Sequence, residues 1–160
     1  MSGIKDRIKE FRRIKASELV PHDKNWRTHD DEQKSVMTGI LNEIGYADAL
    51  IVRKKGDKYQ ILDGHLRADT TPDMEVPVLV VDLNDSEAEK FLLTHDPIAA
   101  MASANDGLLS QLVADVDFDD ASLRLFADQI GDSLDDYDVA DEPDGSNGAT
   151  GPTEMHLRPH

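Results

Sequence analysis

The chain of 160 residues contains no cysteine, and only 5% of its residues are aromatic. The absence of cysteine excludes disulfide bonds, thiolate metal ligands and a cysteine nucleophile. No apolar run approaches the length of a membrane span, and charged residues begin at Lys5. We therefore expect neither a transmembrane helix nor a signal peptide, and an intracellular protein with no membrane partner.

Basic residues are scarce in the second half of the chain. Residues 81–160 contain 3 Lys and Arg against 19 Asp and Glu, whereas residues 1–80 contain 14 of each. The formal net charge of −16 therefore arises entirely from the second half. That half repels a polyanion, while the first half tolerates one. This distribution argues against a broad, tight, nonspecific grip on DNA without excluding a nucleic-acid partner.

The length and the composition together predict one domain and a tail. A chain of this size has room for one modest hydrophobic core. Beyond Gly131 the sequence is rich in Asp, Gly, Ser and Pro and poor in apolar residues. Such a segment cannot bury enough apolar surface to offset the entropy of ordering. We expect a domain over residues 1–131 and a disordered acidic tail over residues 132–160.

Hydrophobic spacing predicts the secondary structure. Ile4, Ile8 and Phe11 recur at helical spacing between charged residues, which predicts a short amphipathic helix over residues 3–11. The other expected elements are strands over 13–16, 49–52, 59–62 and 76–81, and helices over 31–44, from 66, over 87–102, over 107–114 and over 121–130.

Two prolines and one serine refine these boundaries. Pro77 lies close to the start of an apolar strand, which favours a place at a sheet edge or at the beginning of the strand. Ser86 with Glu89 three residues later has the pattern of a capping box. Pro97 is expected to kink or split the helix that follows, because it lacks a backbone N–H and crowds the preceding turn.

The stretch Tyr59–Ala68 combines a strand, a glycine turn and the start of a helix. Gly64 permits a turn that a residue with a Cβ would resist. Free N–H groups at such a turn favour an anion, and Arg67 can grip a phosphate. Asp63 can hold Mg²⁺ or accept a proton from an attacking hydroxyl. The alternative, which these residues alone favour, is a turn in which Asp63 caps the helix and Arg67 is a solvated surface charge.

Three short segments carry a resemblance to a known family. Asn25–His29 followed by Gln33 is similar to the family's Asn-Pro-Arg-x-His box, with tryptophan in place of proline. Gly45–Val52 is similar to the segment that enters the second strand. Asp63–Ala68 is similar to the Gly-x-Arg/His-Arg phosphate motif. In order and spacing these segments resemble the ParB/sulfiredoxin superfamily over about residues 13–105.

The resemblance implies a small α/β (α+β) domain, with a mixed sheet of about four strands, flanking helices and a glycine loop that holds nucleotide phosphates. Members include CTP-binding partitioning proteins, ATP-dependent sulfinic acid reductases, free-serine kinases and viral kinases of 5-hydroxymethylcytosine in DNA. The reductases place a cysteine before the His-Arg of the loop, where this chain has Gly64, so their chemistry is excluded. Partitioning proteins carry a helix-turn-helix and a dimerisation domain, for which the short helices and the tail leave little room.

The resemblance also implies a site. The candidate nucleotide-binding residues are Arg27, His29, Gly64, His65, Arg67 and His95. Asp63 and His65 are the candidate catalytic residues, and Asp63 and Asp96 are the candidate Mg²⁺ ligands. The alternatives are a solvated loop residue for His29 and a helix-break cap for His95. Trp26 has the character of a core or lid residue, although its loop setting leaves base stacking open.

These expectations favour a small kinase that uses ATP or another NTP with Mg²⁺. It would move the γ-phosphate to a hydroxyl, such as the hydroxymethyl group of 5-hydroxymethylcytosine in DNA. Such a protein would act as a monomer or weak dimer in the cytoplasm of a bacterial or phage-infected cell. The alternative is a noncatalytic CTP- or ATP-binding adaptor or DNA-associated regulator, and a nuclease comes third. Asp63 separates these classes, because only chemistry requires its carboxylate.

Overall fold

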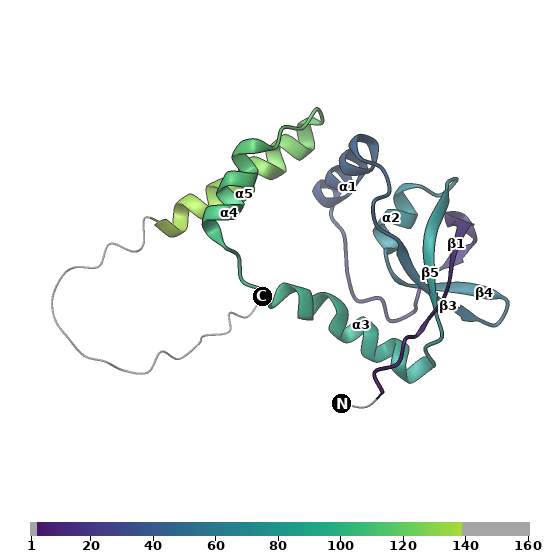
Figure 1. Cartoon of the computed structure of the whole chain (residues 1–160). Coiled ribbons are helices and arrows are strands. Elements are labelled where there is room, and N and C mark those ends of the chain that lie inside the picture. The colour runs from purple at the N-terminus through teal and green to yellow at the C-terminus, as the bar shows by residue number, and fades with distance from the viewer. Residues whose placement is uncertain (1–2, 139–160) are drawn as a thin grey trace, which may run out of the picture.

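A five-stranded mixed sheet forms the centre of the computed structural model, which describes residues 3–138 (Figure 1). The strands are β1 (Ile8–Lys15), β2 (Leu19–Val20), β3 (Leu50–Lys55), β4 (Lys58–Asp63) and β5 (Glu75–Val81), in the spatial order β1-β5-β3-β4-β2. The pairs β1–β5 and β3–β4 are antiparallel, and the pairs β3–β5 and β2–β4 are parallel. The predicted α/β class is confirmed, with the two-residue β2 beyond the expected four strands.

The core lies against this sheet and follows the period of two that strands impose. Leu50 and Val52 of β3 and Val76 and Val78 of β5 are fully buried, and alternate residues of β5 are more exposed. Val and Leu at such alternating positions pack on one pleated face. The predicted strands over 49–52, 59–62 and 76–81 are therefore confirmed.

The expected helix over residues 3–11 is wrong, because this segment leads into β1. A spacing of four residues, as between Ile4 and Ile8, fits a strand period of two as well as a helix. Both side chains and Phe11 are exposed, so no buried apolar face stabilises a helix there. Instead of helical hydrogen bonds, the backbone N–H and C=O groups from Ile8 to Lys15 pair with those of β5.

Five α-helices accompany the sheet. They are α1 (Asp31–Glu43), α2 (His65–Thr70), α3 (Asp85–Ala100), α4 (Asp106–Asp115) and α5 (Ala121–Asp138). The Asp30 side chain caps α1 by accepting from the Gln33 N–H at 2.8 Å, and Gly45 with φ of 88° follows the helix end, as predicted. The start of α3 differs from the prediction, because Asn84 and Glu87 form the capping box rather than Ser86 and Glu89.

Pro97 and Pro77, the two prolines expected to limit a helix and a strand, both lie inside their elements. Pro97 lies near the end of α3, which continues through it to Ala100, so the helix is not split. Close to a helix end the missing N–H removes little of the hydrogen-bonded ladder. Pro77 lies in an interior strand, but pairing of β5 with β3 begins only at Val78, so Pro77 is at the beginning of the strand on that side.

Helices α4 and α5 form a pair beside α1, away from the β3–β4 hairpin (Figure 1). Leu123 of α5 is buried, and a Cβ at Gly39 of α1 would lie 3.1 Å from Leu123 Cγ, so a glycine allows this close approach. Because α5 continues to Asp138, helical structure extends past the predicted boundary at residue 131. Residues 139–160 of the expected tail lie outside the described residues, and the division into domain and tail stays a prediction.

Within residues 3–138, none of the helices combines the length and the apolar character needed to cross a membrane.

Candidate functional site

Gly64 makes the turn between β4 and α2. Its φ of 103° and ψ of 21° lie in the left-handed region that favours glycine. A Cβ there would lie 2.6 Å from Leu50 Cγ and 3.0 Å from Arg67 Nη2, so the turn also needs the absence of a side chain. No side chain caps α2, which leaves its first N–H groups free. Because α2 has six residues, its dipole contributes little, and the charged side chains around the turn dominate the site.

Asp63 and Arg67 pair across this turn, which corrects the simpler alternative drawn from the sequence. Arg67 Nη2 donates to Asp63 Oδ2 at 3.1 Å, and Asp63 caps no helix. The side chains are 16% and 13% exposed, so Arg67 is not a solvated surface charge. Arg67 Nη1 also lies 3.2 Å from Asp48 Oδ2, and the Tyr46 hydroxyl donates to the Arg67 carbonyl at 2.9 Å. Both the guanidinium group and the backbone carbonyl of Arg67 are therefore fixed by hydrogen bonds or ion pairs.

The loop that precedes α1 brings a second guanidinium to Asp63. Arg27 Nη2 lies 3.5 Å from Asp63 Oδ1, and Arg27 Nη1 pairs with the Asp96 carboxylate of α3. The Trp26 indole N–H donates to the Leu92 carbonyl of α3 at 2.9 Å, and the indole is 54% exposed. Trp26 is therefore not a core residue. Its hydrogen bond attaches the loop to α3, and this attachment positions the neighbouring Arg27.

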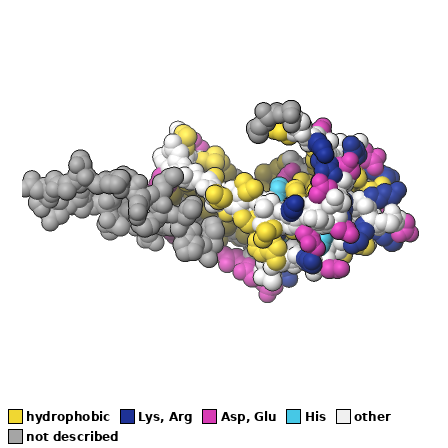
Figure 2. All heavy atoms as spheres, turned by 90° about the horizontal axis from the view of Figure 1, so that it is seen from below, with side chains coloured by type: hydrophobic (Ala, Val, Ile, Leu, Met, Phe, Trp, Pro, Cys, Tyr) yellow, Lys and Arg dark blue, Asp and Glu magenta, His cyan; other side chains and the backbone are white. Residues whose placement is uncertain are grey.

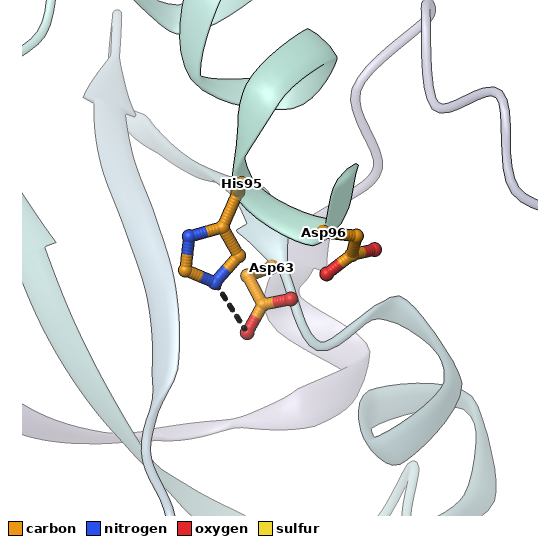
Figure 3. Close-up of side chains that lie close together, drawn as sticks. All are labelled: Asp63, His95 and Asp96. Carbon is orange, nitrogen blue, oxygen red and sulfur yellow. Dashed lines mark ion pairs between the residues drawn. The ribbon is translucent and has the colours of Figure 1, made fainter. Parts of the chain in front are cut away.

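His95 and Asp96 approach Asp63 from α3, as Figure 3 shows. His95 Nε2 lies 4.0 Å from Asp63 Oδ2, and its ring stacks on Phe91 with the centroids 4.5 Å apart. One ligand atom from each of Asp63, His95 and Asp96 lies within 4.8 Å of the others. Since α3 continues past His95, the helix-break cap considered for this residue is wrong.

His65 is almost fully buried, although it contributes to the wall of a cavity beside the turn. The residue is 6% exposed, and its Nε2 accepts from the His22 N–H at 3.3 Å. Burial, assisted by the Arg27 charge, lowers the pKa of His65 to about 4. The ring is therefore neutral near pH 7 and carries its proton on Nδ1, which has no partner among the described residues. A neutral, buried ring is a poor cationic phosphate ligand, so its predicted catalytic and binding roles stay predictions.

A cavity of about 200 Å³ opens beside the turn. Its lining comprises Arg27, His29, Gln33, Met37, Asp63, Gly64, His65, Leu66 and Arg67. His29 is not simply solvated, because its Nδ1 lies 2.9 Å from Gln33 Oε1. His95 and Asp96 lie outside this lining and meet it only through Asp63 and Arg27.

Sequence reasoning missed Met37, Leu66 and Asp48. Met37 follows Gln33 by one helical turn on α1, so helix periodicity could have placed it at the cavity. Leu66 directly precedes Arg67 and lines the cavity as part of α2. Asp48 lies inside the Gly45–Val52 segment, but nothing in the sequence pairs it with Arg67.

The charges of the site do not balance. Three carboxylates, those of Asp48, Asp63 and Asp96, face two guanidiniums, those of Arg27 and Arg67. Each guanidinium is shared between two carboxylates. An anion would therefore compete with the carboxylates for the arginines, or would arrive together with a cation.

The fold is similar to that of a solved chromosome-partitioning protein, ParB. A C-terminally truncated ParB from Caulobacter crescentus, complexed with CTP-γ-S, has a TM-score of 0.55 and 20% identity, over 66% of this chain and 62% of that one. The same protein complexed to the centromeric parS site has a TM-score of 0.43 and 20% identity, over 61% and 51%. A Pnob8-like ParB-N domain has a TM-score of 0.48 and 18% identity, over 86% and 66%.

No family model matches the sequence, and a search of curated proteins finds no match. The chain spans less than two thirds of the length of the Caulobacter protein that it resembles in structure. At 20% identity the likeness establishes the fold and not the activity. The fold expected from the three sequence segments is thereby confirmed: the chain has a ParB-like fold.

Proposed function

We propose that the chain is a nucleotide-binding module that holds the phosphates of a nucleoside triphosphate at the Gly64 turn. The observation that carries this proposal is the convergence of Arg27 and Arg67 on one small cavity beside a left-handed glycine. Arginine suits phosphate because its planar fork donates two parallel hydrogen bonds. The ParB with a TM-score of 0.55 was solved with CTP-γ-S, which makes CTP the first nucleotide to test and ATP the second.

The size of the cavity indicates which part of the ligand it would take. About 200 Å³ is smaller than the pockets of about 300–1,000 Å³ that enclose a whole small molecule. Phosphate groups would lie among the arginines, and the nucleoside would extend over the exposed surface beside them. Binding of this kind depends on the phosphates more than on the base.

The cluster of Asp63, His95 and Asp96 fits a divalent cation that accompanies the nucleotide. Its ligand atoms are within 4.8 Å of one another, and carboxylate oxygens are ligands that Mg²⁺ accepts. Asp63 and Asp96 would hold Mg²⁺, which would supply the positive charge that the site lacks once the phosphates engage the arginines. His95 adds an imidazole, a ligand that suits Zn²⁺ better than Mg²⁺.

We favour a noncatalytic role, as an adaptor or DNA-associated regulator, over phosphoryl transfer. One observation keeps a kinase as the second candidate: Asp63 does not serve as a cap, so its carboxylate is available as a base or metal ligand. Transfer to a hydroxyl needs positioning and charge neutralisation, which the same residues would provide. Incubation with labelled ATP and DNA, with and without 5-hydroxymethylcytosine, separates the two roles, since only a kinase labels the DNA.

Titration calorimetry tests the proposed binding. CTP and ATP with Mg²⁺ should bind, whereas cytidine and adenosine should not, because the arginines recognise phosphate. Equal affinity for nucleoside and triphosphate would contradict a phosphate site. Failure of every nucleoside triphosphate to bind would contradict the proposal as a whole.

A further inference from the structure

Six exposed cationic side chains gather at the end of the molecule away from α4 and α5, and the nucleotide site uses none of them. We call them the basic surface: Arg12, Arg13 and Lys15 of β1, and Lys54, Lys55 and Lys58 of the β3–β4 hairpin. Figure 1 places β1 and the hairpin on the side of the sheet opposite α4 and α5. In Figure 2, most of the visible Lys and Arg side chains lie at this end, interspersed with Asp and Glu, and few are visible on the described atoms of the helical end.

A hollow of about 450 Å³ joins the two halves of the basic surface. It is lined by β1 from Arg12 to Lys15, by Glu18, by the segment Asp57–Tyr59 and by Glu75. The hollow brings β1 and the hairpin to one place, although two other strands separate β1 from β4 in the sheet. A single extended ligand can therefore contact both sets of cations.

Aromatic rings hold the two arginines of this surface. The Arg12 guanidinium donates to the Tyr59 hydroxyl and lies 5.2 Å from the centre of its ring. The Arg13 guanidinium lies 5.0 Å from the centre of the Phe11 ring, which is itself half exposed. Stacking of this kind restricts a long side chain before it binds, which lowers the entropy lost on binding.

Most of these cations have no carboxylate partner. Within residues 3–134, Arg13, Lys15, Lys54, Lys55 and Lys58 have no carboxylate oxygen within 4.0 Å. Six cations of the first half outside this surface are paired, namely Arg7, Lys9, Lys24, Arg27, Arg53 and Arg67, while Lys5 and Lys34 are unpaired among the same residues but lie apart from one another in the sequence. Arg12 has one distant partner, Glu10, at 3.8 Å. The acidic residues that line the hollow, Glu18, Asp57 and Glu75, are too few to balance six cations. The surface keeps a positive charge that an anionic partner would neutralise.

We propose that the basic surface binds the sugar–phosphate backbone of DNA, without sequence preference. Arginine and lysine contacts to phosphates supply nonspecific affinity of this type, and the half-exposed Phe11 offers a face for a base. The strongly acidic second half of the chain repels a polyanion, so the charges of the whole molecule turn the basic surface towards DNA. This inference rests on the charge distribution and not on nucleotide binding at Gly64.

Fluorescence anisotropy with labelled DNA, duplex and single-stranded, tests the proposal on the full chain at low salt. The variant Lys54→Glu/Lys55→Glu/Lys58→Glu is compared with Lys5→Glu/Lys34→Glu/Lys90→Glu, which makes the same change in net charge with exposed lysines elsewhere. The hairpin variant should lose about tenfold or more in affinity, and the control much less, because only the former removes phosphate contacts. For the wild type, the logarithm of the duplex binding constant should fall with the logarithm of salt at a slope between about −2 and −5, as expected for two to six phosphate contacts.

A second variant, Arg13→Glu/Lys15→Glu, changes β1 without touching the hairpin and should also weaken DNA binding. Circular dichroism checks that both variants fold. Equal losses in the hairpin variant and its control would mean that net charge alone governs binding, and would overturn the proposal. So would the absence of DNA binding by the wild type at low salt, or competition by polyglutamate as strong as that by unlabelled DNA, which would point to an acidic protein instead.

Discussion

Asp63 and Arg67 lie on either side of the left-handed Gly64 with their charged atoms 3.1 Å apart. The pairing places a carboxylate where a phosphate would bind. Arg27 reaches the same carboxylate at 3.5 Å, so both guanidiniums are engaged before any ligand arrives. A phosphate that binds here has to displace Asp63 from the arginines, unless a cation takes up the carboxylate at the same time. Affinity should therefore depend on Asp63 in opposite ways with and without Mg²⁺.

The substitution Asp63→Asn tests this dependence. Without Mg²⁺ the variant should bind nucleoside triphosphate about threefold to tenfold more tightly than the wild type, because a charge interaction of about 1 kcal/mol no longer holds the arginines. With Mg²⁺ the advantage should shrink or reverse, since the variant has lost a metal ligand. Calorimetry in EDTA and in Mg²⁺ measures both values. Identical affinities in the two proteins under both conditions would show that Asp63 plays no part in phosphate binding.

The same variant bears on catalysis. If the chain transfers phosphate, Asp63→Asn should lower kcat by about a hundredfold or more, the scale of general-base catalysis. Labelled phosphate on a hydroxymethylated DNA is the measurement, with unmodified DNA as the control. A wild-type protein that binds nucleotide and labels no acceptor supports the noncatalytic role. Full activity in the variant would move the search for a base to His65, His29 or Asp96.

Gly64→Ala should destabilise the fold strongly. The φ of 103° is strained for alanine, and the new Cβ would lie 2.6 Å from the side chain of the fully buried Leu50. Strain and overpacking together should cost at least about 2 kcal/mol of unfolding free energy. Gly56→Ala is a matched control, because Gly56 also has a positive φ, of 64°, but no atom lies within 4 Å of the new Cβ. Urea denaturation compares the two; equal losses would contradict the close packing against Leu50.

His65 makes stability depend on pH in the acidic range. Its pKa is about 4 in the folded chain and near 6.5 when unfolded, so between these values only the unfolded chain binds the proton. Above about pH 6.5 the burial of neutral His65 does not reduce the free energy of unfolding. As the pH drops to about 4, the unfolding free energy falls by about 3 kcal/mol on account of this residue. His22, whose pKa burial also lowers, acts in the same direction.

His65→Gln isolates this contribution. Glutamine can accept from the His22 N–H in place of the ring Nε2 but does not titrate. Between pH 6.5 and pH 4.5 the unfolding free energy of the variant should fall less steeply than that of the wild type. Urea denaturation across this range measures both slopes. Parallel curves would mean that His65 is not kept neutral by burial.

Local chemistry made part of the site predictable from the sequence. Gly64 followed from the need for a turn between a strand and a helix. The ion pair of Asp63 with Arg67 was not predicted, because Asp63 ends β4 and the helix that carries Arg67 begins only after the turn. The partners from α3 were expected only through the resemblance, since nothing local links Asp96 to Arg27. The burial of His65 could not be foreseen, because it depends on the loop around His22, which is distant in sequence.

The secondary structure was likewise predictable where local sequence determines it and not where tertiary pairing does. The strands around Val52 and Val78 are rich enough in β-branched and other apolar residues to be recognised from the sequence pattern. The N-terminal strand was predicted only in part: the expected strand over 13–16 covers the end of β1, but its first half was assigned to a helix because Ile4 and Ile8 fit a helix equally well, and only pairing with β5 decides between them. The start of α3 was predicted two residues too late. The pairs Asn84 with Glu87 and Ser86 with Glu89 have nearly the same capping pattern, and the structure uses the first of them.

The most direct test of the account is the effect of Arg67→Ala on nucleotide affinity. Arg67 is nearly buried, lines the cavity and is held by Asp48 and Asp63. Its removal should cost about 1.5–3 kcal/mol of binding free energy for CTP or ATP with Mg²⁺, the value of a lost charged hydrogen bond. Lys34→Ala, which removes an exposed cation outside the site, is the control and should bind as the wild type does. Calorimetry that finds the same affinity in Arg67→Ala as in Lys34→Ala would contradict a phosphate site at the Gly64 turn.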